Sequence, residues 1–198
     1  YESGSGVRVD TSILEQWLTQ GARDPGGTSR TVTTPETMTL NVQLNLTSDE
    51  IKEKVGAILV NQSLFQKMQA SDCRTKQIDI VIREQNGVEI YRWTVEDSDV
   101  ETMTDGQQEV NLAVRAEKDS YTTDRLSLSF AHSGDLPGKN GITFTTSFSG
   151  NTARNYYSLY AVNPDGTLGE RQTDVPVTVT SAGKVSVKIK HCSEWMIA

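Results

Sequence analysis

The sequence predicts a mainly β fold, an antiparallel β-sandwich with one or two short helices after its first strand. Two observations support this prediction. Apolar and polar residues alternate in many short stretches from residue 38 onward, and turn-forming residues separate these stretches. A helical spacing of apolar residues replaces this alternation near the N-terminus and directly after the first alternating stretch. We therefore expect a leader of residues 1–36 followed by one sandwich domain of residues 37–198.

The leader contains one predicted helix and a linker. Ser12 and Glu15 have the spacing of a capping box, which satisfies backbone N–H groups at the start of a helix. The apolar face of this helix would consist of Ile13, Leu14, Trp17 and Leu18. Residues 21–34 are rich in Gly, Thr, Pro and Arg, a composition typical of a linker. Because the helix is short, it needs a surface to dock on.

The first strand of the sandwich domain is predicted by strict alternation. Its apolar members are Met38, Leu40, Val42, Leu44 and Leu46. Thr47 and Glu50 then have capping-box spacing, which predicts that a helix begins here. The helical stripe that follows consists of Ile51, Val55, Ile58 and Leu59. A second short helix is predicted from Leu64, Phe65 and Met68.

From residue 77 the alternation returns. Residues 78–82 and 88–93 read as two strands of a hairpin, because Asn86-Gly87 between them is a strong two-residue turn signal. Further strands are predicted over residues 110–114, 126–132 and 142–148. Long polar loops separate several of these strands.

The C-terminal stretch, residues 154–198, reads as consecutive short strands. Asn163-Pro164-Asp165-Gly166 is a turn, because proline presets φ and glycine tolerates positive φ. Alternating apolar residues then occupy 175–179 and 185–189. The same phase continues through His191, Ser193, Trp195 and Ile197. If no bulge intervenes, His191 and Ser193 share a face with the apolar residues before them.

Composition limits the classes of partner. The chain has 198 residues and a net charge of −7, and its lysines and arginines are scattered. An acidic surface repels phosphate backbones, so we expect no nucleic-acid partner. No apolar run approaches the roughly 20 residues that a membrane-spanning helix needs, so we expect no membrane span in this chain.

The two cysteines leave two alternatives open. Cys73 and Cys192 are either unpaired buried thiols or one disulfide that ties the middle of the chain to its last strand. A metal site is not expected, because there is no Cys-x-x-Cys motif and neither His132 nor His191 has neighbours at ligand spacing. We expect no cofactor.

Three motifs together resemble a known kind of module. They are the loop Ala131-His132-Ser133-Gly134-Asp135-Leu136-Pro137-Gly138, the hairpin Asn163-Pro164-Asp165-Gly166, and the closing strand His191-Cys192-Ser193-Glu194-Trp195. Their order resembles a β-rich module of exported and surface-attached proteins of Gram-positive gut bacteria, and the resemblance covers roughly residues 37–198. Trp195 stands where this family usually has Tyr. The resemblance implies an extracellular or cell-surface module without known catalysis.

The closing strand also resembles the His-x-Ser/Thr sequence of self-cleaving domains such as the GAIN domain. Carried over, Ser193 would attack the carbonyl carbon of Cys192, His191 would act as base, and the chain would be cut between Cys192 and Ser193. The alternative is that His191 and Ser193 are polar residues paired within the fold, where they fix the register of the last strand.

Other candidate residues have simpler structural interpretations. His132 and Asp135 suggest an acid–base pair, but Asp in a Gly/Pro loop commonly binds its own backbone. Two acidic groups near turns do not match a Ca²⁺ loop: Asp97, Asp99 and Glu101, and Asp165 with Glu170. Two aromatic pairs suggest sugar stacking: Tyr91 with Trp93, and Tyr156 with Tyr160. Cross-strand core packing uses the same residue types, and we favour it for most of these residues.

The sequence therefore predicts an exported, non-catalytic surface module for adhesion, ligand binding or architecture, whose partner is a surface protein, a glycan or another ligand. Binding residues are expected in two loops at the end of the sandwich, residues 133–141 around Asp135 and residues 97–107 around Asp99. The alternatives are a self-processing domain that uses His191 and Ser193, and a carbohydrate-binding accessory domain.

Overall fold

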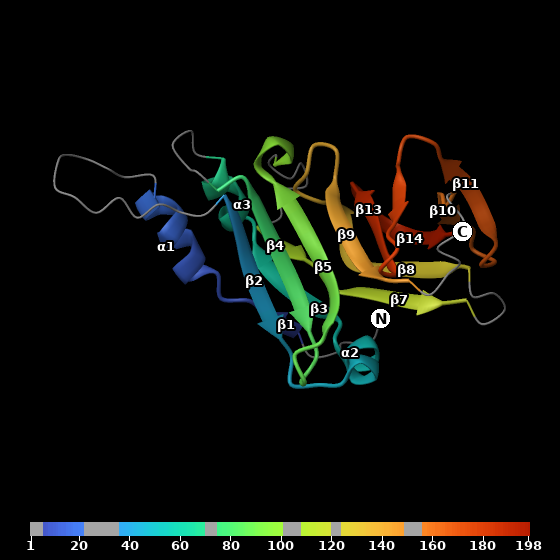
Figure 1. Cartoon of the computed structure of the whole chain (residues 1–198), viewed down its shortest axis with the longest axis horizontal. Coiled ribbons are helices and arrows are strands. Elements are labelled where there is room, and N and C mark those ends of the chain that lie inside the picture. The colour runs from blue at the N-terminus through green and yellow to red at the C-terminus, as the bar shows by residue number, and fades with distance from the viewer. Residues whose placement is uncertain (1–5, 22–35, 70–74, 101–107, 120–123, 149–155) are drawn as a thin grey trace.

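The computed structural model describes residues 6–21, 36–69, 75–100, 108–119, 124–148 and 156–198, and it confirms the predicted mainly β, sandwich-like fold (Figure 1). The six-stranded sheet has the order β12 (Val177–Val179), β13 (Lys184–Ile189), β9 (Ile142–Ser147), β5 (Glu89–Glu96), β4 (Gln77–Arg83) and β2 (Thr37–Gln43). The five-stranded sheet has the order β11 (Leu168–Gln172), β10 (Leu159–Val162), β14 (His191–Ile197), β8 (Leu126–Asp135) and β7 (Val114–Lys118). The three-stranded sheet has the order β1 (Gly6–Arg8), β3 (Ala57–Asn61) and β6 (Glu109–Asn111). The helices are α1 (Ser12–Gly21), α2 (Ser48–Lys54), α3 (Ser63–Met68) and the short 3₁₀ helix η1 (Asp97–Asp99).

The strand pairs are mostly antiparallel, but two are parallel. β2 pairs with β4, and β1 pairs with β3. A parallel pair needs a long crossover between its strands. Between β2 and β4 the segment from α2 through β3 to α3 supplies it, so the helices predicted after the first strand are the crossover that makes parallel pairing possible.

Aromatic side chains fill the space between the two large sheets. The Trp93 ring centroid lies 5.2 Å from that of Phe144 and 5.8 Å from that of Phe130. Trp93 Nε1 and the Tyr91 hydroxyl both donate to the carbonyl oxygen of Leu112, at 3.1 and 3.2 Å. At this point the chain leaves β6 and enters β7 in a different sheet. The prediction of a single strand over residues 110–114 is therefore wrong.

The region after the first strand is partly as predicted. Thr47 and Glu50 form the expected capping box of α2. The helix ends at Lys54, however, and Ile58 and Leu59 lie in β3 rather than on a helical stripe. In β3 the burial alternates, with Ile58 and Val60 buried and their neighbours half-buried or exposed, so the short apolar run has strand periodicity. The predicted second helix is α3, which buries Leu64, Phe65 and Met68.

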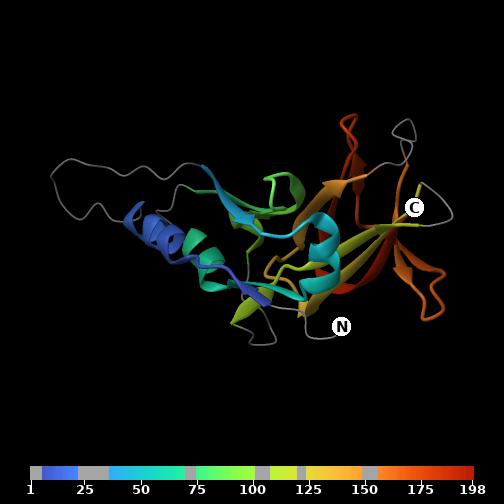
Figure 2. The same ribbon diagram turned by 90° about the horizontal axis from the view of Figure 1, so that it is seen from below.

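The N-terminal segment contacts the rest of the fold at two places. β1 pairs with β3, and α1 packs beside α3, as both views show (Figures 1 and 2). The start of α1 differs from the predicted capping box of Ser12 and Glu15. Here the Thr11 hydroxyl donates to Glu15 Oε2 at 3.3 Å, and the backbone N–H of Ser12 donates to Asp10 Oδ1 at 3.0 Å.

The C-terminal strands β10, β11 and β14 lie at the end of the molecule opposite α1 (Figure 1). The predicted turn joins β10 to β11, with Gly166 at a φ of 79°. After β13 the chain passes from the six-stranded to the five-stranded sheet, where it continues as β14. Among the described helices, none is both long and apolar enough to cross a lipid bilayer.

Candidate functional site

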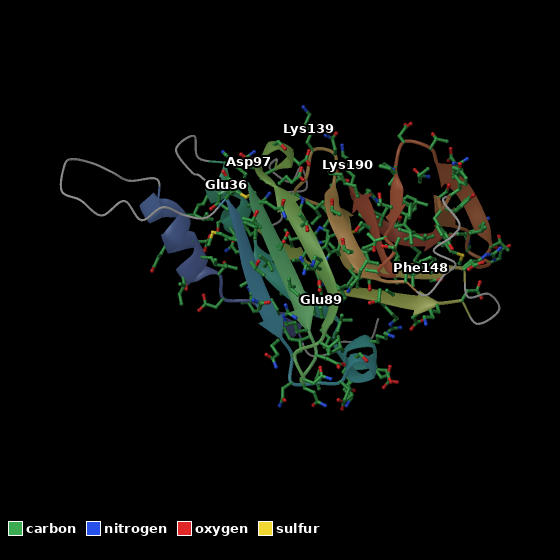
Figure 3. All side chains as sticks on the ribbon, viewed as in Figure 1. Glu36, Glu89, Asp97, Lys139, Phe148 and Lys190 are labelled. Carbon is green, nitrogen blue, oxygen red and sulfur yellow. The ribbon has the colours of Figure 1, made fainter. Side chains whose placement is uncertain are left out.

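The described parts of the two loops predicted to bind a ligand, residues 97–100 and 133–141, meet at one end of the sandwich and contact each other, while residues 101–107 lie outside the described residues. Asp99 is buried in η1, and its Oδ2 forms an ion pair with Lys188 Nζ of β13. Its Oδ1 accepts a hydrogen bond of 3.3 Å from Asn140 Nδ2, and its backbone oxygen accepts one from the N–H of Lys139. We call the set Asp99, Lys139, Asn140 and Lys188 the clasp. Figure 3 labels Lys139 of the clasp and Asp97 of η1 at this end of the molecule.

Close backbone packing holds the clasp loop. Val100 forms a β-bridge with Gly138. A Cβ atom at Gly138 would lie 2.5 Å from the carbonyl oxygen of Gly141, and one at Gly141 would lie 2.5 Å from the carbonyl group of Ile189. The buried carboxylate of Asp99 is satisfied by groups of the protein itself, so the clasp is a structural tie between η1, the loop from β8 to β9, and β13.

His132 and Asp135 do not form an acid–base pair. His132 is buried, and its Nδ1 accepts the backbone N–H of Asn111 at 3.2 Å. Its Nε2 lies 3.2 Å from the backbone oxygen of Asp135, so this contact involves the main chain of Asp135 and not its carboxylate. The neutral tautomer with the proton on Nε2 satisfies both bonds. His132 therefore links β8 to β6, as the packing interpretation of this residue predicts.

The closing strand departs from the predicted phase. His191 and Ser193 are exposed, and Cys192 between them is buried. The register of β14 against β8 shifts between Cys192 and Glu194, so the condition of an unbroken strand is not met. Between Ile189 and His191 the chain also passes from the six-stranded to the five-stranded sheet. Ile197 is fully buried, as expected.

The structure does not bring together the two residues of the self-cleavage prediction. In the described part of the chain, no hydrogen bond joins the His191 ring to the Ser193 hydroxyl, and the bond across the bulge runs from Trp195 Nε1 to the His191 carbonyl oxygen at 3.2 Å. Cys192 is a free thiol, and burial together with the nearby Asp135 carboxylate raises the pKa of Cys192 to about 12. Such a thiol is unreactive near neutral pH. The other cysteine, Cys73, lies outside the described residues.

The aromatic pairs do not form a sugar platform. Tyr91 and Trp93 are buried in the core. Tyr160 is half-buried in β10, and Tyr156 precedes that strand with 90% of its surface exposed. Tyr156 is the one exposed aromatic side chain in the described part of the chain, and one ring alone gives no paired stacking surface.

Two of the acidic turn residues, Asp97 and Asp165, have partners within the protein. Asp165 Oδ1 accepts from the Thr167 hydroxyl and backbone N–H at 2.6 and 3.0 Å, and these bonds lower the pKa of Asp165. Asp97 pairs with Lys76 at 2.9 Å. Glu101 lies outside the described residues, and no cluster of three metal-ligating side chains occurs within them.

A cavity of about 500 Å³ lies where α2 covers the opening between the two large sheets. Its apolar lining includes Ile51, Tyr91, Val114, Ala116 and Leu126. Val88 also lines it and is 57% exposed. The cavity is thus a largely apolar pocket that opens toward the β4–β5 hairpin, at the end of the sandwich opposite the clasp.

Two hydrogen-bonded contacts fix α2 over this cavity. At its N-terminus the backbone N–H of Ser48 donates to Glu84 Oε2 at 3.0 Å. At its C-terminal turn the Arg115 guanidinium donates twice to the carbonyl oxygen of Lys52, at 2.7 and 3.1 Å. Because both ends are tied to neighbouring strands, the helix is a fixed wall of the cavity.

The acidic side chains that line the cavity have partners, whereas two of its lysines form no ion pair among the described residues. Its acidic residues have partners: Glu84 binds the α2 N-terminus, Glu89 binds Arg92 at 2.5 Å, and Glu117 lies 3.9 Å from Arg115. In the described structure, Lys52 and Lys118 line the cavity and form no ion pair. Lys52 and Lys118 are therefore the lining cations that no carboxylate neutralises in the described structure, while Glu84 keeps its negative charge because its partner is a neutral N–H group.

The chain matches no known family model, no curated protein and no solved structure.

Sequence reasoning did not find this cavity. Its lining comes from α2, β5, β7, β8 and β9, so no single stretch carries a recognisable motif. The one local signal is Val88, an apolar residue directly after a hairpin turn, where a polar residue is usual.

Proposed function

We propose that this chain is an exported, non-catalytic surface module that binds a ligand in the cavity beneath α2. The observation that carries this proposal is the apolar cavity of about 500 Å³ with unpaired lysines in its lining. Small-molecule sites generally have a volume of roughly 300–1,000 Å³, a mostly apolar lining and a few polar groups that set orientation.

The lining favours an amphiphilic anion, that is, an aliphatic or aromatic body with one acidic group. The body would lie against Ala116 and Leu126, and its acidic group would lie near Lys52 and Lys118. The protein carries a net charge of −7, so these lysines are a local exception that would attract a negative group.

The remaining parts of the proposal have separate support. The polar clusters described above are satisfied within the fold, which favours a module without catalysis. The resemblance of the loop at Asp135 and of the closing strand at Cys192 to exported proteins of Gram-positive bacteria supports an extracellular location. The buried Tyr91 and Trp93 count against the carbohydrate alternative.

The test is fluorescence titration with two apolar probes, anionic anilinonaphthalene sulfonate and neutral N-phenylnaphthylamine. We expect both to bind, and we expect Ala116→Trp to abolish both signals because the new side chain fills the cavity. The double variant Lys52→Gln/Lys118→Gln should weaken the anionic probe by about threefold to tenfold and leave the neutral probe unchanged.

Lys190→Gln is the matched control, because Lys190 is exposed near the clasp, far from the cavity (Figure 3). It should change neither probe. Absence of binding by the wild-type protein, or an equal loss in the Lys190 variant, would overturn the assignment of this cavity as the ligand site.

A further inference from the structure

β2 is an open edge of the six-stranded sheet, and β4 is its only neighbour among the described strands. The N–H of Leu44 donates to Arg83, and the carbonyl oxygen of Glu36 accepts from Gln77, so the even-numbered residues bond toward β4. Peptide directions alternate along a strand. The backbone groups of the odd-numbered residues therefore point away from the sheet: Thr37, Thr39, Asn41 and Gln43.

This edge lacks the features that normally prevent strand pairing. Proteins protect edges with charges, proline, bulges or very short strands. β2 has seven residues, no charge and no proline, and its register against β4 is unbroken. The other edges are protected: β1, β6 and β12 have three residues each, and β7 and β11 carry charged side chains.

We propose that two copies of this chain associate by pairing β2 antiparallel with β2 of the second copy, around a two-fold axis at Leu40. In this register Thr39 faces Asn41 of the second copy, and Thr37 faces its Gln43. The two-fold axis repeats each of these two pairs with the copies exchanged, which makes four pairs. Each pair exchanges two backbone hydrogen bonds, so there are eight in all. The two six-stranded sheets then form one continuous sheet, and the two-fold symmetry leaves no open β2 edge.

The side chains of β2 suit this pairing on both faces. On the inner face Met38 and Val42 are buried, but Leu40 between them is only half-buried. The pairing places Leu40 against its own copy and covers its remaining apolar surface. On the outer face the paired residues are uncharged, so no like charges oppose each other.

The charge of the chain favours this edge over other surfaces for contact between copies. Two molecules of net charge −7 repel each other, and the repulsion is weakest where no acidic residue stands at the contact. Charges beyond about 8 Å are largely screened at physiological ionic strength. The uncharged strand β2 therefore fits a second copy of the same acidic protein.

The test begins with the mass of the protein in solution, measured by light scattering and sedimentation over a range of concentrations. We expect a dimer, and we expect Thr39→Pro to raise its dissociation constant at least tenfold. Proline removes only an N–H that points away from β4, so the monomer should keep its fold. Thr39→Val keeps that N–H and should remain dimeric.

A cross-link identifies the register. In a Cys73→Ser background, Leu40→Cys should form a covalent dimer on oxidation, because facing residues have Cβ atoms about 5 Å apart. Thr37→Cys should not, because the two copies of residue 37 would lie six positions apart, or about 20 Å. A monomer at every concentration, or a dimer that survives Thr39→Pro and does not cross-link through Leu40→Cys, would overturn the proposal.

Discussion

Gly141 offers a direct test of how rigidly the clasp end of the sandwich is packed. Its φ is 96°, and a Cβ atom there would lie 2.5 Å from the carbonyl carbon and oxygen of Ile189. Gly87, in the β4–β5 hairpin, has a similar φ of 84°, but a Cβ atom there would have nothing within 4 Å of it. Comparing Gly141→Ala with Gly87→Ala therefore separates the effect of close packing from the effect of positive φ.

The expected magnitudes follow from this difference. Alanine in the left-handed region costs about 1–2 kcal/mol at either position. Reduced freedom of the unfolded chain returns about 0.4–1 kcal/mol in both variants. Only Gly141→Ala adds overlap with the backbone of β13, which costs about 1–3 kcal/mol as the neighbouring backbone shifts. We therefore expect Gly87→Ala to lose about 1 kcal/mol and Gly141→Ala about 2–4 kcal/mol of unfolding free energy.

Urea unfolding measures both losses in the same way. Intrinsic tryptophan fluorescence should report the transition, because Trp93 is buried in the core. With a slope of about 2 kcal/mol per molar urea, the two midpoints should differ by roughly 0.5–1.5 M at equal slopes. Equal midpoints for the two variants would show that the backbone of Ile189 yields freely, and would refute the description of the clasp as a close-packed tie.

Three further outcomes are expected. Asp99→Ala should lower the free energy of unfolding by about 1–3 kcal/mol in urea unfolding. This is less than for a fully buried ion pair, because the Lys188 side chain is 33% exposed. Adding Lys188→Met to the same chain should recover part of the loss. Cys192 should resist a maleimide at pH 8 in the folded protein and react with it in urea, because the pKa of Cys192 is raised to about 12. Peptide mapping would locate the modification, and modification of the native thiol would contradict its burial. Carboxylate NMR should find the pKa of Glu50 lowered to about 2 by the backbone N–H of Thr47 in the capping box. The contribution of this box to stability is then complete above pH 4.5 and disappears as the pH falls through 2. An ordinary pKa for Glu50 would mean that the box is open.

The fold could be predicted where a local pattern determines the structure. The strand at Met38–Val42, the Thr47–Glu50 capping box and the Asn86-Gly87 hairpin all follow from residues close together in the chain. Each prediction needs only the residue types within a few positions of one another, which is why the local pattern is sufficient.

Other parts depend on contacts that no local pattern encodes. Ile58 and Leu59 fit a helix as well as a strand, and pairing with β1 and β6 decides for the strand. His191 and Ser193 continue the alternation of β13 in sequence, but a change of sheet intervenes. The sequence predicts the loops at Asp135 and Asp99 as binding surfaces but does not predict their meeting through Lys188, because Lys188 lies on a strand distant in sequence from both.

The two ends of the sandwich differ in a way that bears on function. At one end the clasp joins the described parts of the two loops around buried Asp99, and a side chain at Gly141 would collide with the backbone of Ile189. At the other end α2 covers the opening between the sheets and leaves a cavity. We therefore place the proposed ligand at the α2 end, where the lining leaves space beside Lys52 and Lys118. The loops are less suited to a ligand, because the buried carboxylate between them is already bound to Lys188 and Asn140.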